Sequence, residues 1–347
     1  MASKFSFDLR FLLEELPDRI SVVFDSRLPR LHVDECLMTI QEQLGKHCAV
    51  LSMPGGESIK TQGKVNELWA EWLANDVTRS SLIVAIGGGS ITDLVGFAAS
   101  TFKRGIRWIA MPTTLLGTVD AAIGGKTGIN ALGIKNLAGA FYPPVAVIPN
   151  EIWLHSLPEM EIWNGWMEMA KHAMVHSEVT WQNMVAINPL DVSREALFDL
   201  AEHSSQIKQN IVRSDPHEKG ERKILNLGHT LGHALEAISL SSSGRNMPHG
   251  IAVGWGLCFA LQWSHEKAEH PEKMENAKST IHQWLEMAGC GSTSGLPDAE
   301  SLWRKMKRDK KNRGDEVLDI QLIRMGQAEW DVPLQRPDFD RIWSDVL

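Results

Sequence analysis

The sequence lacks the features that define several classes of protein. Its four cysteines, Cys36, Cys48, Cys258 and Cys290, lie far apart and form no CxxC pair. We therefore expect free thiols in a reducing compartment rather than a disulfide framework. No apolar run is long enough to span a bilayer, and the N-terminal MASKFSFDLR lacks the apolar core of a signal peptide. These absences predict a cytoplasmic protein without a membrane partner.

Positive charge is also scarce. The 347 residues include 35 lysines and arginines against 43 acidic residues, which gives a formal net charge of −8. Because nucleic-acid-binding surfaces are basic, this balance argues against a nucleic-acid partner. We find no repeats, low-complexity tract or proline-rich linker. An ordinary globular composition at this length predicts a sizeable core divided between two domains.

Short apolar runs alternate with helical patterns in the first half of the chain, which predicts an open, mainly parallel α/β sheet. The expected strands are residues 20–25, 48–53, 81–86, 107–111 and 146–148. The third strand runs into Gly87-Gly88-Gly89-Ser90, and a helix follows from about residue 91 with Asp93 in its first turn. Such a turn lets backbone amides approach a pyrophosphate. The pattern is not GxGxxG, however, and a plain tight turn explains it equally well.

The segment GGKTG at residues 124–128 only partly matches a phosphate-binding loop, because Asp120 stands where its first glycine is required. This mismatch disfavours a nucleoside triphosphate. Lys126 and Lys135 still lie among small residues, where an ammonium group and backbone amides can reach a phosphate monoester.

From about residue 154 the patterning becomes helical, so we expect an α/β domain over 1–154 and an all-α domain over 155–347. The apolar run at 320–323 predicts one short strand in the second of these. A helix near 159–175 carries Glu168 and Lys171 within one turn, where a surface ion pair is the simplest interpretation. His229 and His233 lie four residues apart on a second helix, which we expect also to carry Arg222 and Asn226, and His249 follows a Ser/Gly loop. Three imidazoles this close suit a zinc-type ion, although such a pair also arises by chance in a core.

Several motifs together are more specific than any one of them. GGGSITDLVGF, RGIRWIAMPTTLLGTVDAAIGGKTGIN, EMAKH, NLGHTLGHALE, MPHG and DKKN occur in the order typical of 3-dehydroquinate synthases. From about Asp25 to Gly326 the chain resembles that family, which belongs to the sugar phosphate cyclase superfamily. The resemblance implies a Rossmann-like parallel-sheet domain followed by an all-α domain, the dehydroquinate synthase-like fold. It also implies catalytic NAD, a Zn²⁺ or Co²⁺ ion and a homodimer.

The resemblance implies the reaction as well. The substrate would be 3-deoxy-D-arabino-heptulosonate 7-phosphate, and the products 3-dehydroquinate and phosphate in the shikimate pathway. The metal would polarise the C5 oxygen while NAD⁺ accepts a hydride, and the new ketone would acidify the neighbouring carbon so that phosphate leaves by β-elimination. NADH would then return the hydride, and an intramolecular aldol step would close the ring.

The site residues carry over position by position. The metal ligands would be Glu168, His229 and His249, whereas His233, which spacing alone pairs with His229, would face the substrate. The NAD contacts would be Asp25, Glu57, Lys60, Gly88, Gly89, Ser90, Asp93, Thr113, Thr114, Asp120 and Lys135. The substrate contacts would be Lys126, Asn136, Lys171, Lys208, Arg222, Asn226, His233 and Lys310, or Lys311 in its place, with Arg104 from a second subunit. The catalytic groups would be Lys126, Lys171, Lys208, Glu218, Arg222, Asn226 and His233.

The chain departs from the family pattern at Ser90 and Thr92 in the glycine turn and at Ile251, which replaces a carboxylate next to His249. The first two could alter the pyrophosphate turn. The third could remove a partner of a metal ligand and lower metal affinity.

Other functions remain open at this point. A cyclase acting on sedoheptulose 7-phosphate or glucose 6-phosphate would share the fold, NAD and metal, but Lys208 and Arg222 suit a substrate carboxylate that those sugars lack. A metal- and NAD-dependent polyol dehydrogenase would lack the phosphate cluster of Lys126, Asn136 and His233. A non-catalytic binding protein would leave this convergence of polar groups unexplained.

Overall fold

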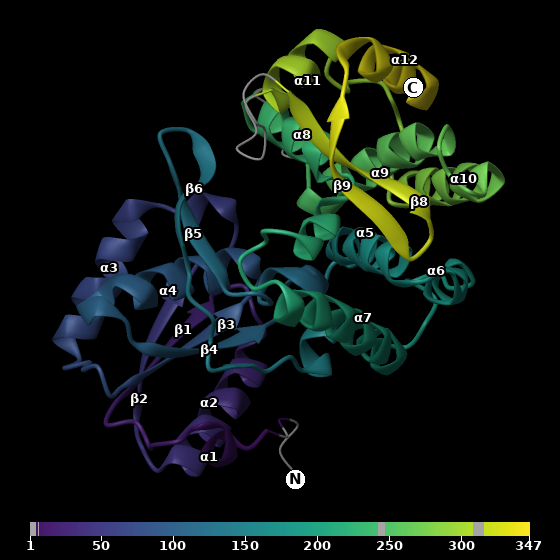
Figure 1. Ribbon diagram of the computed structural model, residues 1–347. Coiled ribbons are helices and arrows are strands. Elements are labelled where there is room, and N and C mark those ends of the chain that lie inside the picture. Colours follow the sequence, from purple (N-terminus) through teal and green to yellow (C-terminus); the bar gives the residue numbers. More distant parts are fainter. Residues whose placement is uncertain (1–4, 6, 242–246, 308–315) are drawn as a thin grey trace. The chain divides into compact units, whose positions relative to one another are not determined.

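The computed structural model describes residue 5 and residues 7–241, 247–307 and 316–347 (Figure 1). Its contacts divide the chain into two compact units. The first unit is Met1–Leu157 with Arg194–Ser205, and the second is Pro158–Ser193 with Gln206–Leu347. The boundary that we expected between residues 154 and 155 stays a prediction.

The first unit contains the parallel sheet, with strand order β2-β1-β3-β4-β7. The strands are β1 Ile20–Asp25, β2 Cys48–Met53, β3 Leu82–Gly87, β4 Arg107–Pro112 and β7 Ala146–Val147. Every residue of β1 and β3 is buried, as expected for central strands covered on both faces. The helices are α1 Leu9–Leu12, α2 Arg30–Leu44, α3 Gln62–Ala74 and α4 Gly89–Thr101, with short turns η1 Glu57–Ile59, η2 Phe102–Arg104, η3 Gly117–Ala121 and η4 Glu151–Ser156.

Alternation along the strands separates two cores. Val23, Ile83 and Ala85 face one cluster together with residues of α3 and α4. Val22 and Val84 face the other cluster together with residues of α2. This period of two, repeated on neighbouring strands, covers both faces of the sheet with helices and confirms the predicted α/β architecture.

The carboxyl ends of the strands lie at one edge of the sheet, because Asp25 is in register with Met53 and Gly87 with Pro112. The loops that follow these strands hold most of the residues predicted to contact NAD. Helix α4 begins at Gly89, two residues earlier than we expected, so Asp93 lies beyond its first turn. A separate antiparallel hairpin, β5 Lys126–Ala131 and β6 Ile134–Phe141, projects from this unit (Figure 1).

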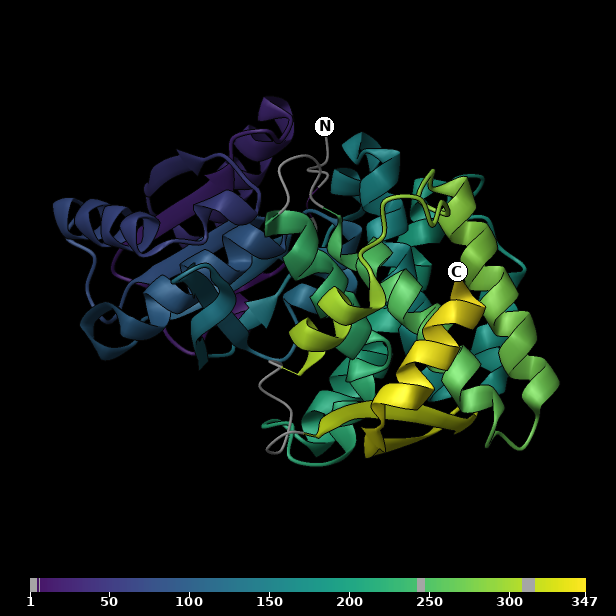
Figure 2. The same cartoon turned by 90° about the horizontal axis from the view of Figure 1, so that it is seen from above.

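The second unit is mainly helical, as predicted. Its elements are α5 Glu159–His176, α6 Glu178–Val185, the end of α7 Arg194–Ser214, η5 Glu221–Asn226, α8 His229–Ser241, α9 His249–His265, α10 Pro271–Met287, α11 Ala299–Met306, α12 Arg336–Val346 and the hairpin β8 Val317–Arg324 with β9 Gln327–Leu334. The sequence pattern indicated only a short strand at 320–323 of that hairpin, which runs along the outside of the helices (Figure 2).

Helix α9 is the centre of the second unit. It contacts α5, α8, α10, α12 and β8, and its residues from Gly250 to Leu261 are all buried. A helix surrounded in this way is apolar on every side, which explains the run GIAVGWGLCFAL. Within the described ranges, no helix is long and apolar enough to cross a membrane.

One expected helix is divided in the structure. We expected Arg222 and Asn226 on the helix that carries His229, but they lie in η5. Gly228 separates η5 from α8 because it adopts a left-handed backbone conformation with φ of 75°. The pattern of apolar spacing cannot reveal such a break, since η5 and α8 both bury residues at helical intervals.

Candidate metal and nucleotide sites

Three of the predicted residues form a compact donor cluster in the second unit. Glu168 lies on α5, and His229 and His249 are the first residues of α8 and α9. The Glu168 Oε1 atom is 3.4 Å from His229 Nε2 and 3.2 Å from His249 Nε2. One ligand atom from each residue lies within 4.8 Å of the other two. Two imidazole nitrogens and a fully buried carboxylate oxygen therefore face a common point, which suits Zn²⁺ or Co²⁺.

Close backbone contacts bring these three residues together. A Cβ atom on Gly250 would lie 1.9 Å from the Asn164 carbonyl oxygen, so only glycine lets the start of α9 approach α5 this closely. The Gly250 amide also donates to Asn164 Oδ1. Asn164 stands one helical turn before Glu168, so this contact brings His249 beside the carboxylate. Glycine and asparagine thus fix the geometry of the ligands.

The two histidines of the cluster have opposite electrostatic surroundings. Burial and the positive charge of Lys171 lower the pKa of His229 to about 3, so its ring is neutral and able to ligate a cation. Burial also lowers the pKa of His249, but hydrogen bonds and charges from Glu168 and Glu236 outweigh this effect and raise it to about 10. Without a metal ion, the positive charge of protonated His249 adds to that of Lys171 beside Glu168. Ligation would release that proton.

His233 and Lys171 adjoin the cluster. The His233 ring centroid lies 5.3 Å from that of His229 and 6.0 Å from that of His249, while His233 is absent from the three-residue donor group. The Lys171 ammonium pairs with Glu168 Oε2 and is almost completely buried. The donor group thus contains Glu168, His229 and His249 without His233, and the assignment of these three residues as metal ligands stays a prediction.

The other predicted residues of the second unit lie mainly around η5. Arg222 and Lys208 are buried, and the Arg222 guanidinium donates to the Pro216 carbonyl at 2.7 Å. Asn226 Nδ2 donates to Glu218 Oε1 at 2.7 Å. Asn226 and Glu218 also line a cavity of about 170 Å³ that includes Thr230, next to His229. Lys310 and its alternative Lys311 lie outside the described residues.

In the first unit, Lys60 is the centre of a polar cluster beside the glycine turn. Its ammonium lies 2.7 Å from Asp93 Oδ2 and 3.7 Å from Glu57 Oε1, and it also donates to Asn136 Oδ1. Glu57 in turn accepts from Asn130 Nδ2 at 2.7 Å. Asn136, which we expected to contact the substrate, therefore lies among the predicted NAD contacts of this unit.

The glycine turn is supported by the residues that depart from the family pattern. Ser90 Oγ accepts a hydrogen bond from the Gly56 amide at 3.0 Å, and Thr92 Oγ1 donates to the Gly89 carbonyl at 3.1 Å. Thr114 Oγ1 accepts from the Gly117 amide at 3.0 Å. Both side chains that depart from the family pattern thus form hydrogen bonds with backbone groups in or beside the turn.

Asp25 ends β1 and is buried. Its carboxylate accepts hydrogen bonds from Arg27 and from the Gly55 amide, the latter at 3.0 Å. Although burial raises the pKa of Asp25, these hydrogen bonds and the Arg27 charge hold it below its usual value. A charged carboxylate at the strand end is a suitable acceptor for a ribose hydroxyl.

The remaining predicted residues of the first unit occupy loops and the hairpin. Thr113 follows β4 and is buried, and Asp120 lies in η3. Lys126 is the first residue of β5, and Lys135 is the second residue of β6. Arg104 is exposed and has a positive φ of 67°. The structure thus brings Glu57, Lys60, Ser90 and Asp93 together beside the glycine turn. Lys126 and Arg104 are exposed.

Sequence reasoning missed Glu236, Asn164 and Asn130. Glu236 Oε2 lies 3.4 Å from His249 Nδ1, so His249 has a carboxylate partner although position 251 is isoleucine. The sequence spacing of Glu236 could have indicated its position, because Glu236 follows His229 by two helical turns and so lies on the same face of α8. Asn164 precedes Glu168 by one turn in the same way. Asn130 had no comparable signal.

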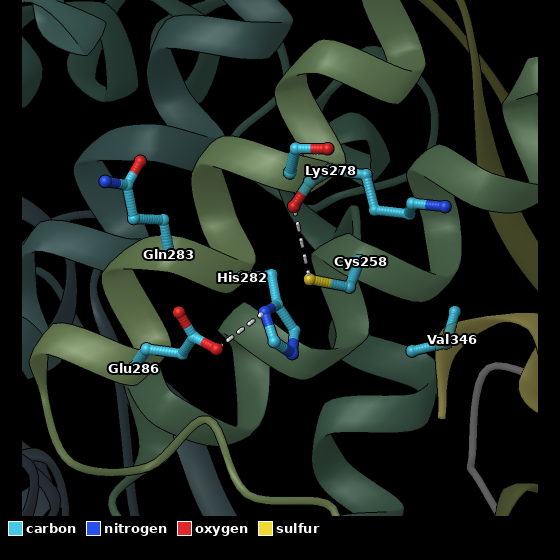
Figure 3. Close-up of a pocket in the computed structure, with 7 residues that line it drawn as sticks. Cys258, Lys278, His282, Gln283, Glu286 and Val346 are labelled. Atoms are coloured by element: carbon cyan, nitrogen blue, oxygen red, sulfur yellow. Dashed lines mark hydrogen bonds and ion pairs between the residues drawn. The ribbon is translucent and has the colours of Figure 1, made fainter.

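A larger cavity of about 230 Å³ lies elsewhere in the second unit, among α9, α10 and α12 (Figure 3). Its lining residues are Cys258, Lys278, Ser279, His282, Gln283, Glu286 and Val346, none of which was predicted. Burial raises the pKa of the Cys258 thiol to about 12, so it is not a nucleophile at neutral pH. The Lys278 ammonium pairs with Glu275 at 2.9 Å. Among the described residues, the lining of this cavity contributes to none of the clustered groups of candidate metal donors.

Solved structures of known proteins share the fold of this chain. A solved structure of 2-deoxy-scyllo-inosose synthase with carbaglucose-6-phosphate, NAD⁺ and Co²⁺ superimposes with a TM-score of 0.81 at 24% identity, covering 96% of this chain and 91% of that one. The 2-epi-5-epi-valiolone synthase of Streptomyces hygroscopicus subsp. jinggangensis, with NAD⁺ and Zn²⁺ bound, gives 0.80 at 20% identity, covering 94% and 90%. The chain therefore shares the fold of these two synthases.

Sequence comparison identifies the family to which the chain belongs. The N-terminal model of 3-dehydroquinate synthase matches residues 50–164, and the C-terminal model matches residues 165–312. The 3-dehydroquinate synthase of Parabacteroides distasonis is 39% identical over 276 residues, which covers 79% of this chain and 76% of that protein. The chain belongs to the 3-dehydroquinate synthase family, which confirms the resemblance seen in its motifs.

Proposed function

We propose that the protein is a functional 3-dehydroquinate synthase, a phosphate-eliminating carbon–oxygen lyase of the shikimate pathway. It converts 3-deoxy-D-arabino-heptulosonate 7-phosphate to 3-dehydroquinate and phosphate. The observation that carries this proposal is the buried cluster of Glu168, His229 and His249 in a chain of this family. A family member that had lost its activity would have no reason to keep these donors facing one another at 3.2 and 3.4 Å.

The cofactors proposed for this activity are NAD and a Zn²⁺ or Co²⁺ ion. Glu168, His229 and His249 would hold the metal, and open coordination positions would remain for substrate oxygens. When bound, the ion supplies polarisation of a substrate oxygen, and NAD supplies reversible hydride acceptance. Two of the structural relatives were solved with NAD⁺ and with Co²⁺ or Zn²⁺, which supports this assignment.

Cationic side chains of the second unit would bind the substrate. Lys171, Lys208 and Arg222 come from α5, α7 and η5, and all three are buried. Buried cations favour anionic partners, so we assign to them the substrate carboxylate and the hydroxyls of the ring. The hydrogen bond between Asn226 and Glu218 orients both side chains at the edge of their cavity. His233, beside the donor cluster, would contact the substrate.

The first unit would bind NAD. Amides of Gly88, Gly89 and Ser90 at the start of α4 are placed to receive the pyrophosphate. Asp25 and the cluster of Glu57, Lys60 and Asp93 would contact the adenosine half and neighbouring groups. Thr113, Thr114, Asp120 and Lys135 would complete the NAD contacts, while Lys126 and Asn136 would reach the substrate phosphate.

The test is phosphate release by metal-loaded protein from 3-deoxy-D-arabino-heptulosonate 7-phosphate, with NAD at a small fraction of the substrate concentration. We expect many turnovers per NAD without net NADH, and a loss of at least about 100-fold after chelation, since the ion supplies several kcal/mol of stabilisation. Re-addition of Co²⁺ or Zn²⁺ should restore the rate. Release from sedoheptulose 7-phosphate or glucose 6-phosphate alone would assign another cyclase, and stoichiometric NADH from a polyol would assign a dehydrogenase.

We also propose that the enzyme is a cytoplasmic homodimer, and that Arg104 reaches the site of the second copy. All four cysteines carry free thiols, as a reducing compartment requires. The β5–β6 hairpin supports the dimer, because the apolar residues Ile134, Leu137 and Phe141 of β6 are about half exposed. Among the described residues, β6 pairs only with β5, so one edge of it can pair with another chain.

Replacing Leu137 by lysine should therefore weaken the dimer. A lysine on an edge strand disfavours pairing with a second strand because the ammonium would have to be desolvated. We expect light scattering after size exclusion to give a dimer for the parent protein and a monomer for Leu137→Lys at micromolar concentration. Leu73→Lys is the matched control, since Leu73 is an equally exposed leucine on α3 and should leave the dimer unchanged. Monomeric parent protein would overturn this proposal.

A further inference from the structure

Glu236 adjoins the donor cluster but has no role in the function proposed so far. It lies on α8, two turns after His229, and 11% of its side chain is exposed. Its Oε2 atom is 3.4 Å from His249 Nδ1. A buried carboxylate is favoured by hydrogen-bond and charge partners, and this contact gives Glu236 one such partner while it constrains the His249 ring.

The two histidine ligands are held in the same way. In each ring Nε2 faces Glu168, and Nδ1 meets an oxygen on the opposite side. For His229 that oxygen is the Leu227 carbonyl, at 3.2 Å, which the backbone fixes in place. For His249 it is the Glu236 carboxylate. Glu168 and Glu236 thus contact the His249 ring at its two nitrogen atoms.

Position 251 cannot supply this interaction. Ile251 is buried in the packing around α9 and has no polar side-chain atom. The carboxylate that orients His249 in this chain therefore comes from α8 rather than from the residues that follow the ligand. Helix α8 thus supplies both His229 and the Glu236 carboxylate, which contacts His249 at the start of α9.

We propose that Glu236 is a positioning residue for metal binding: it accepts the Nδ1 proton of His249 in a hydrogen bond and leaves the Nε2 lone pair for the metal ion. This inference rests on the metal site of the proposed function. A carboxylate behind a histidine ligand fixes the tautomer and the ring plane and increases the basicity of the ligating nitrogen. Glu236 itself does not touch the ion.

The experiment measures the Kd of Co²⁺ and of Zn²⁺ for metal-free protein by competition with a chromophoric chelator, in the absence of substrate. We expect Glu236→Ala to weaken binding by about 10- to 100-fold. Glu236→Gln should recover most of that loss, because its amide oxygen can accept the same Nδ1 hydrogen bond. The visible spectrum of the Co²⁺ protein should change for Glu236→Ala and stay close to that of the parent for Glu236→Gln.

Glu272→Ala is the control, because Glu272 is an exposed carboxylate on α10, with 67% of its side chain exposed. If Glu236→Ala does not fold, Glu236→Asp takes its place in the binding measurement. The aspartate side chain is too short to reach Nδ1 of His249, so we expect this variant to bind metal about tenfold more weakly than the parent. Binding by Glu236→Ala or Glu236→Asp within twofold of the parent would overturn the inference, as would parent protein that binds neither ion. Failure of the proposed function is distinct, because it would appear as absent phosphate release from parent protein that binds metal normally.

Discussion

Glu168→Gln should abolish tight metal binding and slow phosphate release by at least about 10³-fold, which corresponds to about 4 kcal/mol of transition-state stabilisation. Glu168 is the member of the donor cluster that contacts both histidines, through a single oxygen atom. An amide oxygen of the same size carries no charge, so the divalent ion would lose its only anionic ligand in the cluster. The rate loss and the metal content after dialysis can be measured on the same preparation.

The same substitution leaves Lys171 buried without the carboxylate that it pairs with, so some loss of stability is expected. Thermal unfolding of the metal-free variant separates this effect from lost ligation. Glu159→Gln is the matched control, since Glu159 is an exposed residue at the start of the same helix and should leave the rate unchanged. A folded Glu168→Gln protein that releases phosphate within tenfold of the parent rate would refute the assignment of Glu168 as a ligand.

Gly256→Ala should destabilise the second unit by roughly 3 kcal/mol, at the upper end of the cost of overpacking a core. A Cβ atom at position 256 would lie 1.8 Å from the Gly228 carbonyl oxygen, where two backbones meet. Neither backbone can rotate away as a side chain can. Gly228 immediately precedes His229, so the shift should also displace that ligand and weaken metal binding.

Gly254→Ala tests whether this effect depends on the backbone contact. Gly254 lies on the same helix, but its added Cβ would meet side-chain ends, Leu285 Cδ2 at 3.0 Å and Met167 Sδ at 3.1 Å. Those flexible ends can move, and alanine favours a helix over glycine by about 1 kcal/mol. We expect the midpoint of denaturant unfolding to fall for Gly256→Ala and to change little for Gly254→Ala. Equal effects would show that the contact with Gly228 is not responsible.

Regular elements were accessible from the sequence because their apolar patterns are local. The runs at 20–25, 48–53 and 107–111 form strands at or within a residue of the expected bounds, and the helix at 159–175 is α5. The break at Gly228 was not accessible, since it results from the approach of Gly228 to Gly256 across 28 residues of chain. The β8–β9 hairpin was only half predicted, because mixed polar and apolar residues in β9 give no clear alternation.

The chemistry of the site divides in a similar way. Motif order alone predicted Glu168, His229 and His249 as the metal ligands, although His229 and His233 lie closer to each other in the sequence. The structure places the three predicted residues together. Glu236, by contrast, was not selected, because a glutamate on a helix face looks like any solvated charge until its partner is known. The position of Asn136 beside Lys60 was likewise hidden, because the two residues are 76 positions apart in the sequence.

The sequence by itself determined the family, the parallel sheet and the identity of the residues predicted to carry the chemistry, because each depends on residue types in a fixed order. Tertiary structure decided which of these residues meet and through which atoms. Glu168, His229 and His249 come from the middle of one helix and the starts of two others, and they converge because glycines at 228, 250 and 256 let backbones touch. Contacts of this kind depend on distances between distant segments, which no local pattern encodes.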